Sequence, residues 1–507
     1  MNKRHVQTTS LLLALGLACG AAAQTPGGVL RAGMQADPVG LDPHVTEATS
    51  TRNQLENVYD TLVAFDNSGR IVPALATRWT ASPNGLTWTF TLRPGVRFHN
   101  GRALEASDVV YSIGRIKNPA TKSPRSGDFE LVKSVTAPNK TTVVMTLSKP
   151  FSPLLSKLAF SLNVIVPREA AATLNTKPVG TGPFTFVEYV PQTRMVLRKN
   201  PNFWGRDARG NRLPYLDGIT FTYLPDPTAR VTALRTNTVD WIEYVPATDI
   251  KTLQANPQVT VLGGPSANYR AIFFNVAKKP LDDPRVRRAI AYAINNQEIV
   301  DVALLGTGGL PARGTTLPNG NYYAAPDPNY GKPNLERARA LLREAGYPNG
   351  FPLDLKVTST YDFLRTPAEI IQAQLAPLGI KVNITALEWS VYLPDILKKN
   401  YTATILGESG QGDPDDYLYT PFASDSGGNL TNFKDAALDR LLDQGRQTSA
   451  AAARKTIYAQ VQRRLVDLSP MVFLYSSTQY EAATRRVQGY QHFPNTSYLG
   501  FRTTWLR

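Results

Sequence analysis

The chain is nearly free of cysteine. Its 507 residues include a single one, Cys19, which lies close to the N-terminus. If that segment is removed during export, the mature chain has no thiol. Disulfides and cysteine-ligated metal sites are then excluded.

The sequence also lacks any later apolar run near the ~18 residues that a membrane-spanning helix needs. At the N-terminus, Lys3 and Arg4 precede a short apolar run over residues 11–18, and Ala21-Ala22-Ala23 offers small residues for cleavage. This pattern predicts a secretory signal peptide over residues 1–23 and an exported chain. The alternative is a lipobox at Leu17-Ala18-Cys19-Gly20, in which lipidated Cys19 anchors the protein.

Blocks of like charge are absent as well. The formal net charge is +15, yet no run of five or more Lys and Arg occurs, and acids are interspersed with the bases. We therefore interpret the charge as a solvated surface with a modest preference for acidic ligands or anionic membrane, and we predict no nucleic-acid partner.

Motifs of the common hydrolases are missing. Neither Gly-x-Ser-x-Gly nor His-Glu-x-x-His occurs, and only His44, His99 and His492 lie beyond the signal segment. Gly180-Thr181-Gly182 completes neither a dinucleotide fingerprint nor a P-loop. The acids of residues 413–416 lack EF-hand spacing. The sequence thus predicts no enzyme, no cofactor and no metal.

What is present begins with a β-rich stretch over residues 64–176. Thr87–Leu92 alternates apolar and polar residues with the period of a strand, and Val143–Leu147 does so less regularly. Between them we expect a helix capped by Ser107.

Residues 276–475 alternate helix and strand patterns. Asp283-Pro284 predicts a helix start, and Asn334 begins another that stops at Gly346. Strands are expected at residues 353–357 and 380–384. A helix between them is predicted to begin at a capping box formed by Thr366 and Glu369. Short connections favour a parallel β-α-β unit.

Residues 401–420 combine a short strand pattern with a polar loop. Ala403-Thr404-Ile405-Leu406 is followed by three glycines and Asp413-Pro414-Asp415-Asp416. A strand that opens into a Gly-rich loop at its carboxyl end is where open α/β sheets hold ligands. Taken alone, the segment is also compatible with a solvated turn.

Several blocks in order resemble one family. They are residues 88–101 (WTFTLRPGVRFHNG), 108–112 (DVVYS), 180–184 (GTGPF), 198–204 (RKNPNFW), 274–275 (FN), 280–289 (PLDDPRVRRA), 345–347 (AGY), 378–380 (LGI) and 413–415 (DPD). The chain resembles the family 5 extracellular solute-binding proteins, the dipeptide- and oligopeptide-binding receptors of ABC importers, over almost its whole length.

The resemblance implies an α/β, two-lobed periplasmic-binding-protein fold of the large three-domain type, with mixed sheets and a β-rich subdomain. The implied division starts with a signal peptide, residues 1–23. Domain I is discontinuous, 24–63 plus 177–275 plus 476–507. Domain II is the β-rich subdomain 64–176, and domain III is the α/β second lobe 276–475.

The resemblance also implies ligand-binding positions. Peptide-binding relatives place an acid for the peptide ammonium where this chain has Gly410, and Glu408 or Asp413 could substitute by a shift of the loop. Arg365 matches the arginine that holds the peptide carboxylate in dipeptide receptors. Its guanidinium suits a carboxylate.

Further expected contacts are weaker inferences. They are Glu47, the apolar walls Tyr269 and Trp389, and the loop residues Ser409 and Gln411. Asn275 is a candidate too, although a role in fixing the crossing between lobes is the alternative. Tyr269 and Trp389 are also compatible with core packing.

The expected function is therefore an extracytoplasmic receptor that captures a peptide or peptide-like solute between two lobes and delivers it to an ABC importer permease. We expect a monomer that is peripheral to the membrane. The alternatives are a receptor of the same fold for an oligosaccharide, an opine or a metal chelate, or a sensor or chaperone.

Overall fold

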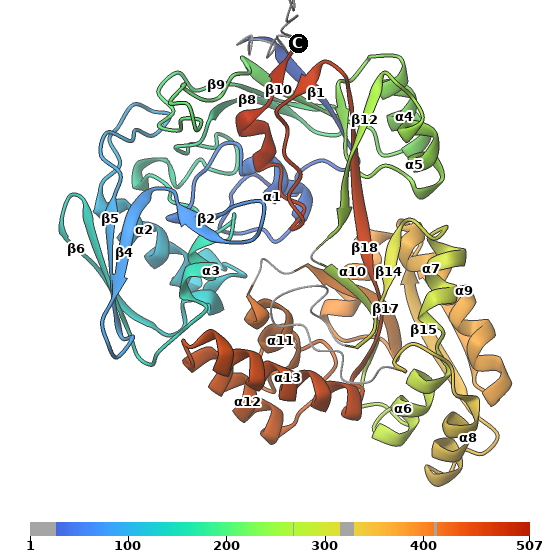
Figure 1. The fold of residues 1–507 in the computed structure, drawn as a ribbon. Coiled ribbons are helices and arrows are strands. Elements are labelled where there is room, and N and C mark those ends of the chain that lie inside the picture. Colours follow the sequence, from blue (N-terminus) through green and yellow to red (C-terminus); the bar gives the residue numbers. More distant parts are fainter. Residues whose placement is uncertain (1–26, 267, 315–328, 410–412) are drawn as a thin grey trace, which may run out of the picture.

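The computed structural model describes residues 27–266, 268–314, 329–409 and 413–507. Within them the chain forms two lobes joined by one long mixed sheet (Figure 1). The strand order is β16 (Lys381–Leu387), β15 (Pro352–Thr358), β17 (Ala403–Ser409), β13 (Asn268–Phe274), β18 (Met471–Thr484), β11 (Trp241–Ile242), β1 (Val29–Met34), β10 (Gly218–Tyr223), β9 (Arg194–Lys199) and β8 (Phe184–Val190), while β12 (Val259–Pro265) and β14 (Gly309–Pro311) also pair with β18.

Strand β18 belongs to both lobes. Its first residues, Met471–Tyr475, pair with β13 of the second lobe, and Thr478–Thr484 pair with β12 of the first lobe. In Figure 1 it runs as one red ribbon from the upper lobe to the lower one. The predicted boundary between residues 475 and 476 falls inside this strand. The domain division stays a prediction.

The second lobe is an α/β layer. Its helices are α6 (Pro284–Ala293), α7 (Asn296–Ala303), α8 (Leu335–Glu344), α9 (Asp362–Leu375), α10 (Trp389–Leu397), α11 (Pro414–Phe422), α12 (Ala436–Gln447) and α13 (Ala451–Leu468). Asp283 and Asn334 cap α6 and α8, as predicted, because each side chain accepts a hydrogen bond from a backbone N–H of the first turn. Strands β15 and β16 pair in parallel, so the predicted β-α-β unit is confirmed.

The first lobe carries the β-rich part of the chain. Its four-stranded antiparallel sheet has the order β4 (Ala76–Ala81), β5 (Thr87–Leu92), β7 (Thr142–Leu147) and β6 (Val132–Asn139). Helix α2 (Ala106–Lys117) packs Val109, Ile113 and Ile116 against Phe90 and Val143 in one buried core.

The remaining elements of the first lobe are shorter. They are α1 (Thr49–Leu55), α3 (Leu154–Ala159), α4 (Pro227–Arg235), α5 (Ala247–Gln254), the 3-10 turns η1 (Pro119–Thr121), η2 (Ser126–Phe129), η3 (Arg168–Ala170) and η5 (Leu499–Thr503), and the strands β2 (Val63–Phe65), β3 (Ile71–Pro73), β19 (Val487–Gln488) and β20 (Trp505–Leu506). In the second lobe, η4 (Ala376–Leu378) extends α9 as far as Gly379. Among the described residues, no helix combines the length and the apolar character needed to cross a membrane.

Two predicted helix starts are wrong. Helix α2 is capped by Glu105 and not by Ser107, because Glu105 keeps extended backbone and forms a reciprocal capping box with Asp108. Helix α9 begins at Asp362, before the predicted box of Thr366 and Glu369, and contains Pro367.

A proline in a helix interior leaves the carbonyl four residues earlier without its helical donor. That carbonyl, on Phe363, accepts a hydrogen bond from the Tyr475 hydroxyl instead. Tyr475 of β18 therefore makes Pro367 compatible with α9. This contact is distant in the sequence, so the local pattern could not predict it.

The third correction concerns residues 401–420. The predicted strand is present as β17, and it lies in the second-lobe sheet between β15 and β13. Helix α11 begins at Pro414 with Asp413 as its N-cap, whereas the predicted loop extended through Asp416. The acids of this segment thus lie in the first turn of a helix.

Candidate functional site

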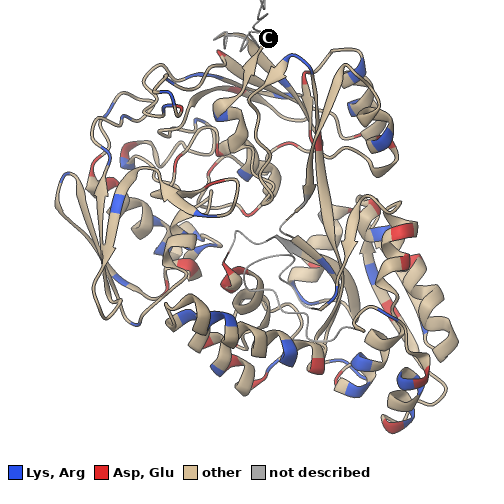
Figure 2. Cartoon of the chain, viewed as in Figure 1, with Lys and Arg blue, Asp and Glu red and all other residues tan. Residues whose placement is uncertain are grey.

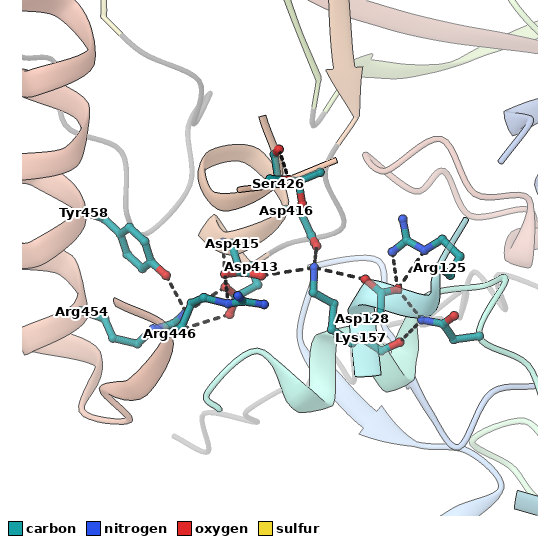
Figure 3. Close-up of polar contacts among 12 residues, drawn as sticks. Arg125, Asp128, Lys157, Asp413, Asp415, Asp416, Ser426, Arg446, Arg454 and Tyr458 are labelled. Carbon is teal, nitrogen blue, oxygen red and sulfur yellow. Dashed lines mark hydrogen bonds and ion pairs between the residues drawn. The ribbon is translucent and has the colours of Figure 1, made fainter. Parts of the chain in front are cut away.

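The two lobes touch through a buried lysine. Lys157, on α3 of the first lobe, lies 2.5 Å from Asp416 and 3.3 Å from Asp415, both in the first turn of α11 in the second lobe. It also lies 3.7 Å from Asp128 of its own lobe. Figure 3 shows this ammonium between the carboxylates of the two lobes. With 4% of its side chain exposed, the lysine is sealed by the contact.

The acids on α11 are each paired with a base. Asp413 accepts two hydrogen bonds from Arg454, at 2.8 and 2.9 Å, and one from the Asp415 backbone N–H. Asp415 lies 3.0 Å from Arg446. Acidic side chains also interact favourably with the positive end of a helix. The segment is therefore a compensated charge cluster, as Figure 3 shows.

Burial and neighbouring charges shift the pKa values of this cluster in opposite directions. Burial alone would lower the pKa of Lys157, but Asp416, Asp415 and Asp128 together raise it above its usual range. Burial raises the pKa of Asp415 against the nearby charges of Lys157 and Arg446. Lys157 thus stays charged, and it supplies part of the compensation that the buried Asp415 needs.

Backbone and ring contacts extend the same interface. The Ser152 backbone N–H donates to the Arg446 carbonyl at 2.7 Å, and the Ser152 hydroxyl donates to the Thr448 carbonyl at 2.6 Å. The Arg446 guanidinium lies 3.6 Å from the ring centroid of Tyr419 and 4.9 Å from that of Phe151. Because these bonds join residues of both lobes, the structure is a closed arrangement.

Two arginines of the first lobe border this contact. Arg125 and Arg52 lie 4.0 and 5.9 Å from the ring centroid of Phe160. Arg125 also pairs with Asp128 at 2.6 Å. Glu47 is exposed, yet the protein atoms around it raise its pKa, and the Arg125 charge opposes that rise.

Tyrosines of the two lobes lie close enough for their charges to interact. Tyr244 of the first lobe has a left-handed backbone with φ of 48°, a conformation that bulky residues rarely adopt outside functional segments. Its pKa is raised by burial and by the charge of Glu243, and it lies within electrostatic range of Tyr361 in the second lobe. Tyr361 stacks edge-on against Trp389 at 5.1 Å.

Several predicted contacts lie in structural roles. Tyr269 is buried and packs edge-on against Phe473 at 5.3 Å. The Asn275 amide donates to the carbonyls of Lys399 and Tyr401, both at 3.1 Å, which fixes the end of β13 to the start of β17. The Tyr269 contact is of the core-packing kind, whereas the Asn275 bonds lie within the second lobe and leave its suggested role in the crossing untested. Neither excludes ligand contact, so both residues remain predictions.

Arg365 lies on α9 with 44% of its side chain exposed. It pairs with two acids of its own helix, Asp362 at 3.1 Å and Glu369 at 3.8 Å. Glu408 and Ser409 end β17, where they pair in register with Tyr269 and Asn268. Gly410 and Gln411 lie outside the described residues.

The structure therefore brings Asp413 into the charge cluster and Trp389 into the aromatic group, with Glu47 beside Arg125. Arg365 and Asn275 belong to neither group. As ligand contacts, Glu47, Tyr269, Asn275, Arg365, Trp389, Glu408, Ser409, Gly410, Gln411 and Asp413 all remain predictions.

Sequence reasoning missed Lys157, Arg446, Arg52 and Tyr244. One signal was available for Lys157, because it is the only charged residue in the stretch from Phe151 to Phe160. A lysine in such a stretch is buried only when it is paired. The pairing of Arg446 and the backbone of Tyr244 leave no comparable trace in the sequence. In the part of the chain that the structure describes, no three His, Cys, Asp or Glu side chains gather as a metal site would require.

Comparison with known proteins gives a consistent picture. Residues 70–429 match the model of the bacterial extracellular solute-binding proteins, family 5. The chain is 30% identical to the dipeptide-binding protein of Escherichia coli K12, over 91% of this chain and 93% of that one.

Solved structures agree in fold. The PBP AgaA of A. tumefaciens R10 in complex with agropinic acid superposes with a TM-score of 0.85 and 31% identity, covering 95% of this chain and 99% of that one. The periplasmic binding protein DppA from Helicobacter pylori, in complex with the peptide STSA, gives a TM-score of 0.84 and 30% identity, covering 95% and 98%.

Proposed function

Because the chain belongs to the bacterial extracellular solute-binding proteins of family 5, we propose that it captures a peptide or peptide-like solute between its lobes and delivers it to the permease of an ABC importer. The observation that carries this proposal is the contact of Lys157 with Asp415 and Asp416 across the lobes. A receptor that works by closure needs contacts that exist only in the closed state.

The physical logic is a two-state equilibrium. A solute shifts the lobes toward closure only by its difference in affinity for the closed and open forms. The charge cluster and the Ser152 hydrogen bonds add a fixed contribution to closure that does not depend on the solute. Solute contacts from both lobes supply the remainder, and the permease binds the closed form.

The peptide class is supported by the relatives, two of which are named for or were solved with peptides. A non-peptide solute is the second candidate, and one observation favours it. Asp413, a possible substitute for the ammonium-binding acid, is already held by two hydrogen bonds from Arg454. A ligand ammonium would have to displace that guanidinium.

Further parts of the proposal follow from the sequence. The chain is exported by residues 1–23, or anchored through Cys19, and acts as a monomer peripheral to the membrane. It catalyses no reaction and needs no cofactor. Acidic and basic residues are interspersed along the helices of the cartoon in Figure 2, as suits a solvated receptor.

The test is to identify the bound solute. Protein purified from its native host is denatured, and the released small molecules are analysed by mass spectrometry. A micromolar ligand, worth about −8 kcal/mol, partly survives purification. Di- or oligopeptides are expected. A sugar, opine or chelate in their place would overturn the peptide class and support the second candidate.

A further inference from the structure

Arg52 differs from the cations that neutralise carboxylates in the first lobe and at its interface. Lys157, Arg125 and Arg502 each have a carboxylate within 2.8 Å. Arg52 is 4% exposed and forms none of the ion pairs found among the described residues. Glu56 lies within electrostatic range of Arg52 but forms no direct ion pair with it. A buried charge that lacks a direct opposite partner is costly, so its presence calls for an explanation.

The hydrogen bonds of Arg52 go to neutral oxygens. Its Nε and Nη2 donate to the Asn53 side-chain oxygen at 3.2 and 3.1 Å, and Nη2 also donates to the Thr496 hydroxyl at 2.9 Å and to the Asn495 carbonyl. Nη1 donates to no group within the described residues. Because a guanidinium carries five N–H donors in a rigid fork, the Nη1 side of Arg52 is available to a ligand.

Two other buried arginines make the contrast clear. Both guanidinium termini of Arg287 donate to main-chain carbonyls, and so do both termini of Arg230. These two arginines hold loops together, and their terminal donors are used within the fold. Arg52 shares their burial but leaves one terminus unused, so loop fixation alone does not account for it.

Arg52 also lies where the lobes meet. It is beside the Phe160 ring that Arg125 covers, and Arg125 is joined to the interlobe cluster through Asp128. Its charge interacts with Tyr244, which in turn is in range of Tyr361 and Arg270 of the second lobe. The guanidinium therefore lies in the first lobe, beside the residues that border the interlobe cluster.

The electrostatics of this position favour an anion. Burial lowers the pKa of Arg52, the Arg125 charge lowers it further, and Glu56, Tyr244 and Tyr498 oppose the change. Glu56 is itself held by the Ser497 hydroxyl and by the Tyr498 backbone N–H. An added negative charge between Arg52 and Arg125 would relieve their mutual repulsion.

We propose that Arg52 binds the carboxylate of the captured solute, with Arg125 as a second positive charge, so that the receptor selects organic anions. The inference rests on the proposed function and specifies its substrate class. A guanidinium fork recognises a carboxylate through two parallel hydrogen bonds, which a neutral amide cannot reproduce. Closure then brings the second lobe over a charge pair that water no longer screens.

The experiment is isothermal titration of the full mature chain with four probes. They are the dipeptide Ala-Phe, N-acetyl-Ala-Phe, Ala-Phe amide and 3-phenylpropionate. Wild type, Arg52→Gln and Arg52→Lys are compared, with Arg78→Gln as a control that removes the same charge from an exposed strand of the β-rich sheet. Melting curves verify that each variant is folded.

Carboxylate probes should bind wild type at least tenfold more tightly than the amide. Arg52→Gln should lose that preference, Arg52→Lys should keep part of it, and Arg78→Gln should keep all of it. If Arg52→Gln does not fold, two other measurements test the role of Arg52. They are the affinities of Arg52→Lys and the ratio of the wild-type affinities for Ala-Phe and Ala-Phe amide.

Each other result is decisive. Equal binding of Ala-Phe and its amide, or an unchanged affinity in Arg52→Gln, overturns the role of Arg52 and leaves peptide capture standing. Binding of 3-phenylpropionate alone, lost in Arg52→Gln, supports Arg52 and overturns the peptide class. Binding of no probe overturns both.

Discussion

Helices α6 and α11 begin with the same two residues and differ in everything around them. Asp283-Pro284 and Asp413-Pro414 each place a capping aspartate before a proline. Asp283 pairs with Arg285, two residues along, at the surface. Asp413 pairs with Arg454, 41 residues away on α13, in a buried position. The Asp-Pro pair determines where each helix begins. The residues around it determine how much stability is lost when the capping aspartate is replaced.

The largest effect is expected from Asp413→Ala. It leaves the buried guanidinium of Arg454 without its carboxylate, which costs about 3–5 kcal/mol in the free energy of unfolding. Urea denaturation measures it. Replacing both partners, as Asp413→Leu with Arg454→Met, should recover most of the loss. A single-variant loss below about 1 kcal/mol would show that the two helix starts are equivalent after all.

Lys157→Met should come next. It removes the positive charge that joins α3 to the first turn of α11, so the closed form is weakened. We expect solute affinity to fall about tenfold, or about 1.4 kcal/mol, and small-angle scattering to show a more open average shape. Lys140→Met is the matched control, because that lysine pairs with Glu105 while 82% of its side chain is exposed. Equal changes in both variants would contradict the role of Lys157.

A smaller effect on stability is expected when the pH is lowered. Burial pushes the pKa of Asp128 upward, but Arg125 and Lys157 outweigh it and hold the pKa below its usual range. A depressed folded pKa gives stability that is present above the unfolded value, about 3.9, and lost as pH falls through the folded value. Asp128→Asn should therefore flatten the fall in melting temperature below about pH 4. Wild-type and variant curves that stay parallel would refute this.

The smallest effect is expected at α6. Asp283→Ala removes only a cap and a surface pair, so we expect a loss of about 1 kcal/mol in unfolding free energy. Asp283→Ser should restore most of it, because a serine hydroxyl caps the same N–H groups. A loss as large as that of Asp413→Ala would erase the distinction between the two starts.

The sequence predicted those parts of the fold that local patterns specify. Strand β5 matches its expected residues, and α6 and α8 begin at the expected caps. The α11 start carries the same Asp-Pro signal as α6, yet the glycines before it led to its interpretation as a loop. Helix α9 was placed too late because Pro367 is tolerated only through Tyr475, whose hydroxyl binds the Phe363 carbonyl 112 residues away in the sequence.

The candidate site was harder to predict for the same reason. Lys157 and Asp416 are separated by 259 residues, and Arg52 and Thr496 by 444. Pairings over such separations depend on how the sheets assemble, which no local period encodes. The resemblance to a family supplied the two-lobed fold, and it supplied a region of the site that stays a prediction. It gave no sign that α11 already carries its own counter-charges.

Strand β18 has a mechanical consequence. Its fourteen residues stay hydrogen-bonded to neighbours in both lobes, so the lobes are not joined by slack chain alone. Rotation of one lobe against the other must twist a paired ribbon, whose resistance grows with the angle. The joint behaves as a torsion spring with limited travel, and an empty receptor opens only as far as that spring permits.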